Sequence, residues 1–453
     1  MPYLASAIAL IFVIASGEGL LLLLRLRSSE GSVPSRMCAA FAAGIAVCAT
    51  WSFLLALLHV RATAFLLAAP VILYPVGRIA GRRGAAPETA GPARGPSPKL
   101  LAAAAALVAA AESTYVFHQA WIRPVHGWDA WRIWSFRAKV LFVERGFPAD
   151  FFSSDWAGFP GYPLGIPFVE AFLAQAIGFW HGPAVKMLFP LFYVALLWTA
   201  YALVRNRSGR RAALIGLLLL APAPLLVHHG TVAYMDLPLS FFLLAAVFYG
   251  TRWRESGSRG DLLLAALHAG FLPQIKNEGL PLYIVLTAWF VWSARRERGL
   301  LRKAALWLTA SLPFCLPWLL FKYVAGVPDS PYHALSFPGF PALAARLADI
   351  LRLTAINLFL SGSWGVAWYS LLLLFIPGRP RGAGAAPFVL AGGALTFAAA
   401  YLFTESYSFL LNGTALARNL LVLLPLAVAT GLSGLGGAPA RSATRPVEEK
   451  RRS

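Results

Sequence analysis

The chain has 453 residues, of which 58% are hydrophobic and only 13% are charged. Soluble domains are about 45–50% apolar and about 25% charged, so this composition excludes a soluble enzyme, a disordered chain and a secreted disulfide scaffold. The formal net charge is +20, which in a soluble protein would suggest nucleic-acid binding, whereas in a membrane protein it first indicates which loops face the cytoplasm.

Apolar runs recur along the whole chain, and several are about 18 residues long or longer, which is enough to cross a membrane. They predict an all-α, polytopic integral membrane protein. The first run is too long for the core of a signal peptide and ends in two arginines, so it predicts a first span rather than a cleavable leader. In chain order the runs cover 4–24, 38–58, 62–77, 100–117, 163–180, 184–204, 212–227, 237–250, 262–273, 280–294, 304–321, 360–376, 384–403 and 419–435.

Seven segments between or beyond the runs are rich in Lys and Arg. They hold 27 basic and 7 acidic residues, which is the whole net charge of +20. Short loops of this kind stay in the cytoplasm, so the charge reports orientation and requires no nucleic-acid partner. The segments are 25–36, 78–99, 205–211, 252–261, 295–303, 379–381 and the tail 441–453.

Placing all seven segments inside predicts about thirteen spans, with the N-terminus outside, the C-terminus cytoplasmic and residues 118–183 as a long outer loop. Two runs, 163–180 and 184–204, then compete for a single crossing. The first is broken by Pro167 and Gly178, so we predict that it lies on the outer face or dips into it.

The same pattern divides the chain into three parts. These are an N-terminal three-helix membrane segment with a basic linker over 1–99, a membrane core over 100–440 and a basic cytoplasmic tail over 441–453. The three cysteines, Cys38, Cys48 and Cys315, all lie in apolar runs and predict neither a disulfide framework nor a metal cluster.

The outer loop is dense in aromatic residues, with the sequence HGWDAWRIWSFRAK over 126–139. Wound as a helix, this segment has an apolar arc on one side and Asp129, Arg132 and Lys139 on the other, as in helices that lie at a membrane surface. An aromatic belt with snorkelling cations explains the tryptophans, but anchoring gives no role to the carboxylate of Asp129. The apolar arc contains Trp131, Trp134, Ala138, Leu141 and Phe142.

A second polar cluster, HHGTVAYMDLP over 228–238, forms the outer turn between two runs. Asp236 comes one residue before an apolar run, where a carboxylate either stabilises a helix N-terminus or serves the function of the protein. His228 and His229 are not part of any zinc-binding spacing, and interfacial hydrogen bonding is the simpler role for them.

A third cluster, LPQIKNEG over 272–279, interrupts two short runs. We expect Lys276 and Glu278 below the outer surface in a protein-lined cavity, or paired with each other to close a hairpin. Arg418 begins the last run on the outer side, where it would bind either lipid headgroups or a phosphate in a site. The loop 322–350 adds three less specific candidates, Asp329, Tyr332 and His333.

In this order the clusters resemble the lipid-dependent glycosyltransferases of the GT-C fold, in particular bacterial relatives of protein mannosyltransferases and of the RgtA/B/C/D-like group. The resemblance implies a helical bundle of which residues 100–440 form the core, with interfacial helices in its outer loop. It also implies a catalytic aspartate in that loop, here Asp129, and a polyprenyl-phosphate sugar as donor. The motifs that carry it are GWDA at 127–130 with Trp134 and RAK at 137–139, YPL at 162–164, YMDLPL at 234–239 and KNEG at 276–279.

The chain departs from the family pattern at one position. Relatives are expected to have an acidic residue directly before the YPL motif, where this chain has Gly161. Asp155, seven residues before Tyr162, is the candidate replacement for this second acidic site. The spans before residue 100 resemble an addition to the usual core.

Sugar transfer from a polyprenyl phosphate needs a carboxylate to accept the proton of the acceptor hydroxyl, cations for the leaving phosphate and a groove for the lipid. Asp129 is placed for the first role, and the resemblance favours inversion at the anomeric carbon. No cofactor is firmly implied and a divalent metal is left open. Candidate ligands of the donor phosphate are Arg137, Lys139, Lys276 and Arg418, and candidates for the second acidic site or for support are Asp155, Asp236, Glu278, Tyr162 and His126.

The prediction is therefore a glycosyltransferase of the bacterial inner membrane that acts at the extracytoplasmic face on a lipid, glycan or protein acceptor. The main alternative is a transporter or flippase of a lipid-linked sugar, which would show corresponding broken helices in two halves of the chain. Only one such break, at 273–279, occurs. A non-catalytic membrane subunit is the third possibility, and it would have no reason to gather Asp129, Asp236 and Lys276 on one face.

Overall fold

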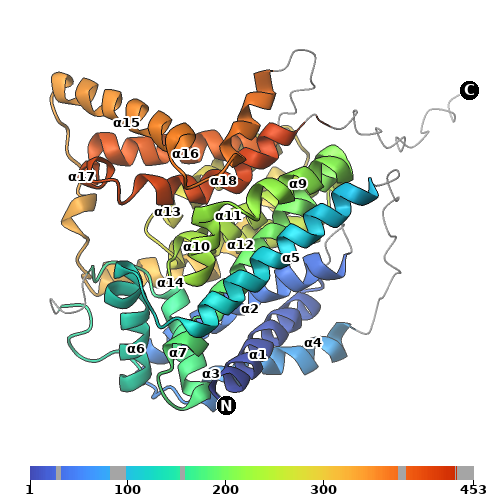
Figure 1. Ribbon diagram of the computed structural model, residues 1–453. Helices are drawn as coiled ribbons and strands as arrows, with labels where there is room; N and C mark the ends of the chain where they lie inside the picture. The colour runs from blue at the N-terminus through green and yellow to red at the C-terminus, as the bar shows by residue number, and fades with distance from the viewer. Residues whose placement is uncertain (27–31, 82–97, 154–158, 376–383, 434, 436–453) are drawn as a thin grey trace, which may run out of the picture.

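The computed structural model is a bundle of helices (Figure 1) and describes residues 1–26, 32–81, 98–153, 159–375, 384–433 and 435. Within these residues the only extended pairing is an isolated antiparallel bridge between Leu335 and Thr404. The prediction of an all-α protein is confirmed. The predicted division into three parts stays a prediction, because most of the basic linker and the whole tail 441–453 lie outside the described residues.

The first two helices, α1 (Pro2–Leu23) and α2 (Val33–Leu57), pack against each other as a close antiparallel pair. A Cβ atom on Gly17 would lie 1.9 Å from the carbonyl oxygen of Ala40, and one on Gly44 would lie 1.9 Å from that of Val13. Membrane helices approach this closely only where small residues face each other. The predicted third span, 62–77, falls in one continuous helical stretch made of α3 (Ala64–Ala68), the 3-10 turn η1 (Ala69–Ile72) and α4 (Leu73–Gly81), which is among the shorter apolar helices.

We expect Gly44→Leu to destabilise the protein by about 1–3 kcal/mol or more, because the added side chain meets the backbone of α1 rather than a movable side chain. The measurement is the midpoint of thermal unfolding of the purified protein in detergent. Gly362→Leu is the matched control, since a Cβ there meets no atom within 4 Å. An unchanged midpoint for Gly44→Leu would show that the two helices are free to separate.

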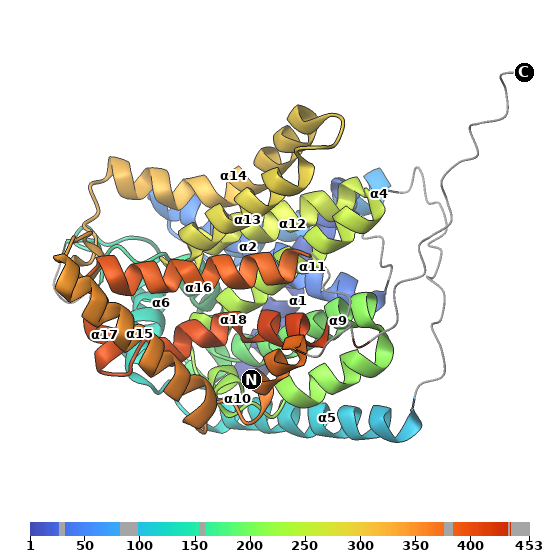
Figure 2. The same ribbon diagram turned by 90° about the horizontal axis from the view of Figure 1, so that it is seen from above.

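Helix α11 (Asp236–Ser256) forms the centre of the bundle, as Figure 2 shows. Nearly all of its residues from Asp236 to Trp253 are buried, because a helix that is apolar on every side must be surrounded by other helices. It packs against α9, α12, α13, α16 and α18. The other elements between residues 98 and 300 that surround it or lie further out are α5 (Lys99–Ile122), α8 (Gly182–Val185), α9 (Leu188–Leu220), α10 (Pro224–Thr231), α12 (Arg259–Phe271), the 3-10 turn η4 (Leu272–Gln274) and α13 (Gly279–Ala294).

The predicted break between the runs 184–204 and 212–227 is present. Gly209, inside the range of α9, has φ 83° and ψ 174°, so the helix is interrupted there. A residue with a side chain rarely adopts this φ, which explains why glycine occupies the break. The basic segment 205–211 thus lies at a turn between two helical pieces, as predicted.

The segment predicted to be an outer loop forms the predicted helix, as a π-helical turn η2 (Ala130–Trp134) that continues into α6 (Ser135–Glu144). Most of the predicted apolar arc is buried, whereas Trp131 is 55% exposed. The following helix, α7 (Gly165–Ile177), covers most of the run 163–180 and is buried over Gly165–Ala174 among α1, α2 and α6. It therefore does not lie flat on the surface of the bundle, and its predicted dip from the outer face stays a prediction.

The C-terminal third differs most from the prediction. No apolar run was predicted inside the loop 322–350, yet α15 (Phe340–Leu360) begins there. Its charged residues interrupt the apolar sequence, so the search for apolar runs did not find it. The run 360–376, predicted as a span, forms only the 3-10 helix η6 (Ala367–Phe375). The other elements are α14 (Leu300–Val324), the 3-10 turn η5 (Pro331–His333), α16 (Ala385–Phe403), α17 (Tyr407–Leu411) and α18 (Leu416–Leu432).

Many helices are apolar enough to face lipid. Among the described residues six are long and apolar enough to cross a membrane, or seven if the bent pair α10 and α11, which meet at 111°, forms one span. Shorter apolar helices, including α7, α13 and α18, lie between them. The protein is therefore a multi-pass membrane protein, and the number of about thirteen spans stays a prediction.

Candidate active site

A cavity of about 950 Å³ lies at one end of the bundle. Its wall is made where η2, α11, α13 and α18 begin and where α14 and α16 end, together with the loop that follows α14. All three polar clusters of the sequence reach it. Its charged and polar wall residues include Asp129, Tyr162, Tyr234, Lys276, Asn277, Glu278, Asp329, His333, Tyr401, Arg418 and Asn419.

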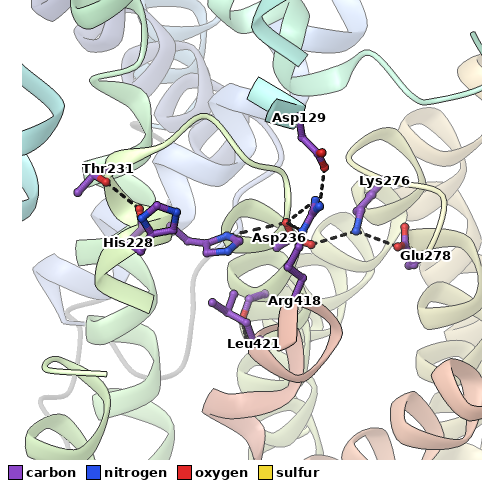
Figure 3. Close-up of polar contacts among 10 residues, drawn as sticks. Asp129, His228, Thr231, Asp236, Lys276, Glu278, Arg418 and Leu421 are labelled. Carbon is purple, nitrogen blue, oxygen red and sulfur yellow. Dashed lines mark hydrogen bonds and ion pairs between the residues drawn. The ribbon is translucent and has the colours of Figure 1, made fainter. Parts of the chain in front are cut away.

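Five charged side chains form one continuous row at this cavity (Figure 3). The guanidinium of Arg418 lies 2.5 Å from Asp129 Oδ2 and 3.0 Å from Asp236 Oδ2. The ammonium of Lys276 lies 3.0 Å from Asp236 Oδ1 and 2.8 Å from Glu278 Oε1. Three carboxylates therefore alternate with two cations in the order Asp129, Arg418, Asp236, Lys276, Glu278.

The central carboxylate differs from the outer two in its exposure. The side chain of Asp236 is fully buried, whereas those of Asp129 and Glu278 are 19% and 28% exposed and line the cavity. Asp236 is in the first turn of α11 and binds both cations, so it positions them and also stabilises the helix N-terminus. Burial would lower the pKa of Lys276, but the carboxylates of Asp236 and Glu278 outweigh it and raise the pKa, which keeps the ammonium charged.

A tight turn places Asp129 at the cavity. Gly127 has φ 88°, and a Cβ on it would lie 2.8 Å from the hydroxyl oxygen of Tyr234. Only glycine allows this loop both its conformation and its close approach to that ring. Arg418 also contacts this tyrosine, because its guanidinium carbon lies 4.9 Å from the centre of the Tyr234 ring. The glycine of the GWDA motif thus sets the position of the carboxylate two residues later.

Neutral aromatic and polar side chains surround the charged row. Trp128 is 54% exposed beside Asp129, and the rings of Trp134 and Tyr162 lie 5.2 Å apart. Burial, and next the carboxylate of Glu278, raise the pKa of the Tyr162 hydroxyl, so it stays neutral. Burial lowers the pKa of His333, whose Nδ1 lies 3.3 Å from the amide nitrogen of Asn277.

Three predicted site residues lie away from both the cavity wall and the charged row. Arg137 is buried and donates to the carbonyl oxygens of Pro160 and Tyr162, because α6 packs that face against the loop before α7. Lys139 is exposed on α6, and His126 contacts the carbonyl of Pro124 through Nδ1. Neither Arg137 nor Lys139 therefore lines the cavity, and their predicted role as ligands of a donor phosphate stays a prediction. Arg137 instead holds in place the loop that carries Tyr162.

The predicted second acidic site at Asp155 stays a prediction, and another carboxylate lies beside Gly161. Asp155 lies outside the described residues. A Cβ on Gly161 would lie 2.7 Å from the carbonyl oxygen of Pro328 and 3.4 Å from Asp329 Oδ1, so no larger side chain fits there without a shift of that loop. Asp329, ion-paired with Lys322, therefore supplies a carboxylate to the cavity next to the position where the family pattern has one.

Other wall residues were not found from the sequence. Asn277 lies inside the KNEG motif but had no assigned role, and Tyr401 accepts a hydrogen bond of 2.8 Å from Asn419. Tyr401 and Asn419 are polar residues within the mostly apolar helices α16 and α18, which is the one signal that could have identified them. Among the described residues, no group of three or more His, Cys, Asp or Glu is arranged to hold a metal ion.

Fold and cavity together define a class, namely polytopic membrane proteins with a charged cavity at one end of a helical bundle. Within that class, residues 162–321 match the family described as dolichyl-phosphate-mannose-protein mannosyltransferase. The matched segment is about a third of the chain and contains Asp236, Lys276 and Glu278, but neither Asp129 nor Arg418. No curated protein matches the chain.

The fold has a counterpart among solved structures. ArnT from Cupriavidus metallidurans bound to undecaprenyl phosphate aligns with a TM-score of 0.52 at 15% identity over 74% of this chain. This chain spans 59% of the length of that protein. The apo state of the same protein aligns with a TM-score of 0.49 at 15% identity, over 73% of this chain and 60% of the other. The prediction of a GT-C fold is confirmed.

Proposed function

We propose that this protein is a membrane glycosyltransferase that transfers a sugar from a polyprenyl-phosphate donor to an acceptor hydroxyl. The observation that carries the proposal is the charged row, which sets the partly exposed carboxylate of Asp129 next to Arg418, with Lys276 further along the row, on the wall of one large cavity. The family match over 162–321 and the fold of ArnT, a protein solved with undecaprenyl phosphate bound, support the same class of donor.

The row can carry out this chemistry with its own residues. The phosphate of the donor binds Arg418 and Lys276, competes with the carboxylates for them and releases Asp129 from its ion pair. Asp129 then accepts the proton of the acceptor hydroxyl while the acceptor oxygen bonds to the anomeric carbon. The bond from that carbon to the phosphate oxygen breaks, and the two cations stabilise the departing polyprenyl phosphate. A single displacement of this kind inverts the anomeric centre.

The wall offers a place for the lipid tail. Leu280, Leu319 and Phe397 contribute apolar surface from α13, α14 and α16. In the most apolar 18-residue stretch of each of α14 and α16, only 28% of the residues are buried inside the bundle. Both helices therefore present most of their surface to lipid. A polyprenyl chain can therefore extend from the cavity along helices that already border the membrane.

Charge supports the orientation in which the cavity faces the extracytoplasmic side. α11 and α13 begin at the cavity and end at the basic segments 252–261 and 295–303. The positive-inside rule puts these segments in the cytoplasm of the cell that makes the protein. We infer that the N-terminus is outside, that the C-terminus is inside and that the acceptor, whether lipid, glycan or protein, is met outside the cytoplasm.

The experiment is transfer in proteoliposomes that contain the purified full-length protein and a polyprenyl-phosphate sugar with a labelled sugar. We expect labelled product to form when an acceptor-containing membrane extract is supplied on the side of the cavity. Movement of labelled donor across the bilayer without any glycosylated product would overturn the proposal and identify a flippase. Protein-free liposomes with the same extract give the background.

A further inference from the structure

A second cavity, of about 720 Å³, lies at the other end of the same helices. It is formed where α11 and α13 end and α16 begins, together with Arg207 of α9. Since α11 and α13 begin at the first cavity and α16 ends there, three helices of 16 to 21 residues separate the two. Their lengths, about 24–32 Å, match the roughly 30 Å of a bilayer core. Figure 2 shows α16 running across the bundle from the side of α17.

The second cavity has an excess of positive charge. Four arginines and two glutamates line it. Glu297 is ion-paired with Arg254 and also with Lys303, which lies outside the lining. Among the described residues, no carboxylate pairs with Arg207 or Arg296. Two guanidinium groups are thus available to an anion at this end of the bundle.

A buried hydroxyl also lacks a partner there. Thr251 lines the cavity and is only 4% exposed, and its Oγ1 has no hydrogen-bond partner among the described residues. Buried polar atoms in folded proteins are nearly always hydrogen-bonded, so an unpaired hydroxyl at a cavity wall can donate to a ligand atom that enters the cavity. A phosphate oxygen near Arg207 and Arg296 would satisfy this hydroxyl as an acceptor.

The surroundings of the cavity are those of a membrane surface. Trp292 is 60% exposed and has the guanidinium of Arg295 over its ring, and Phe388 is 39% exposed. Tryptophan and arginine together are typical of the headgroup region of a bilayer. An apolar rim of this kind suits a ligand that has both a phosphate and acyl chains, and serves no purpose for a free ion.

We propose that the second cavity binds the phosphate headgroup of an anionic lipid from the leaflet opposite the first cavity. Arg207, Arg296 and the hydroxyl of Thr251 contact the phosphate, while Trp292 and Phe388 lie against the start of the acyl chains. The site is separate from the charged row, and its occupancy does not depend on the glycosyl-transfer reaction proposed above.

The test is a lipid titration of the purified full-length protein in neutral detergent, with the unfolding temperature and native mass spectrometry as readouts. Phosphatidylglycerol is expected to bind saturably and raise the unfolding temperature, whereas phosphatidylcholine and inorganic phosphate are not. In the double variant Arg207→Gln/Arg296→Gln, half-saturation should require roughly 10- to 30-fold more phosphatidylglycerol than in the unchanged protein, because two charges near the headgroup are lost. In Thr251→Val it should require roughly fivefold more.

The matched control is Arg211→Gln with Arg302→Gln, which removes two exposed arginines outside the cavity lining. The proposal is overturned if this control loses as much affinity as the cavity variant, since the binding would then be a diffuse surface effect. It is also overturned if inorganic phosphate binds as tightly as phosphatidylglycerol, or if no saturable binding occurs. Thr251→Val keeps the shape of the side chain and gives a result even if the double variant fails to fold.

Discussion

Replacing Asp129 by Asn should lower the turnover of sugar transfer by about 10²–10⁴-fold, the usual contribution of a general base. The amide keeps the size of the carboxylate but cannot accept a proton from the acceptor hydroxyl. Because the change also frees Arg418 from one of its two partners, binding of the donor phosphate should be as strong as before or stronger. Turnover should therefore fall while the KM for the donor does not rise.

The control for this variant is Asp150→Asn, which removes an exposed carboxylate in the same outer loop but outside the cavity lining. It should retain full transfer activity. Full activity in Asp129→Asn would contradict the assignment and transfer the role of base to Glu278, the other carboxylate of the row that reaches the cavity. A parallel measurement on Glu278→Gln then decides between the two.

The second large effect is expected for Arg418→Gln. Loss of one cation that faces the departing phosphate should lower kcat/KM by about 10²–10³-fold. The same change removes a partner from the fully buried Asp236 and should also destabilise the protein by about 3–5 kcal/mol, since an incompletely paired buried carboxylate is costly. Transfer kinetics and the midpoint of thermal unfolding measure the two effects separately.

A charge-compensated variant separates function from folding. Arg418→Gln combined with Asp236→Asn removes both members of the buried pair, so thermal stability should recover while transfer stays low. Lys139→Gln, which removes an exposed cation on α6, should leave both measurements unchanged. Recovery of transfer together with stability in the double variant would show that Arg418 is needed only for folding.

The sequence was sufficient for the centre of the site because its charges stand out against an apolar background. Asp129, Asp236, Lys276, Glu278 and Arg418 were all singled out as ionisable groups at or near membrane depth, where such groups are costly. The structure brings all five into one row. Helical spacing also placed the apolar arc of η2 and α6 on one side, and most of that arc is buried in the bundle, whereas Trp131 is exposed.

What could not be predicted depends on contacts between distant segments. Periodicity tells which side of α6 carries Arg137 but not that the loop at 160–162 covers that side and takes its hydrogen bonds. The role of Asp329 depends on the loop after α14 lying against Gly161, a contact across about 170 residues of chain. α15 was missed because its charges interrupt any apolar run.

The charged row also bears on how the protein is made. Its members lie at 129, 236, 276, 278 and 418, and Arg418, on the last described helix, is the only link between Asp129 and the rest of the row. While the ribosome is still producing the segments before α18, Asp236 has Lys276 as its one strong partner. The charged row, to which we assign donor binding, is therefore completed only when α18 has inserted, so a partly synthesised chain in the translocon lacks a complete row.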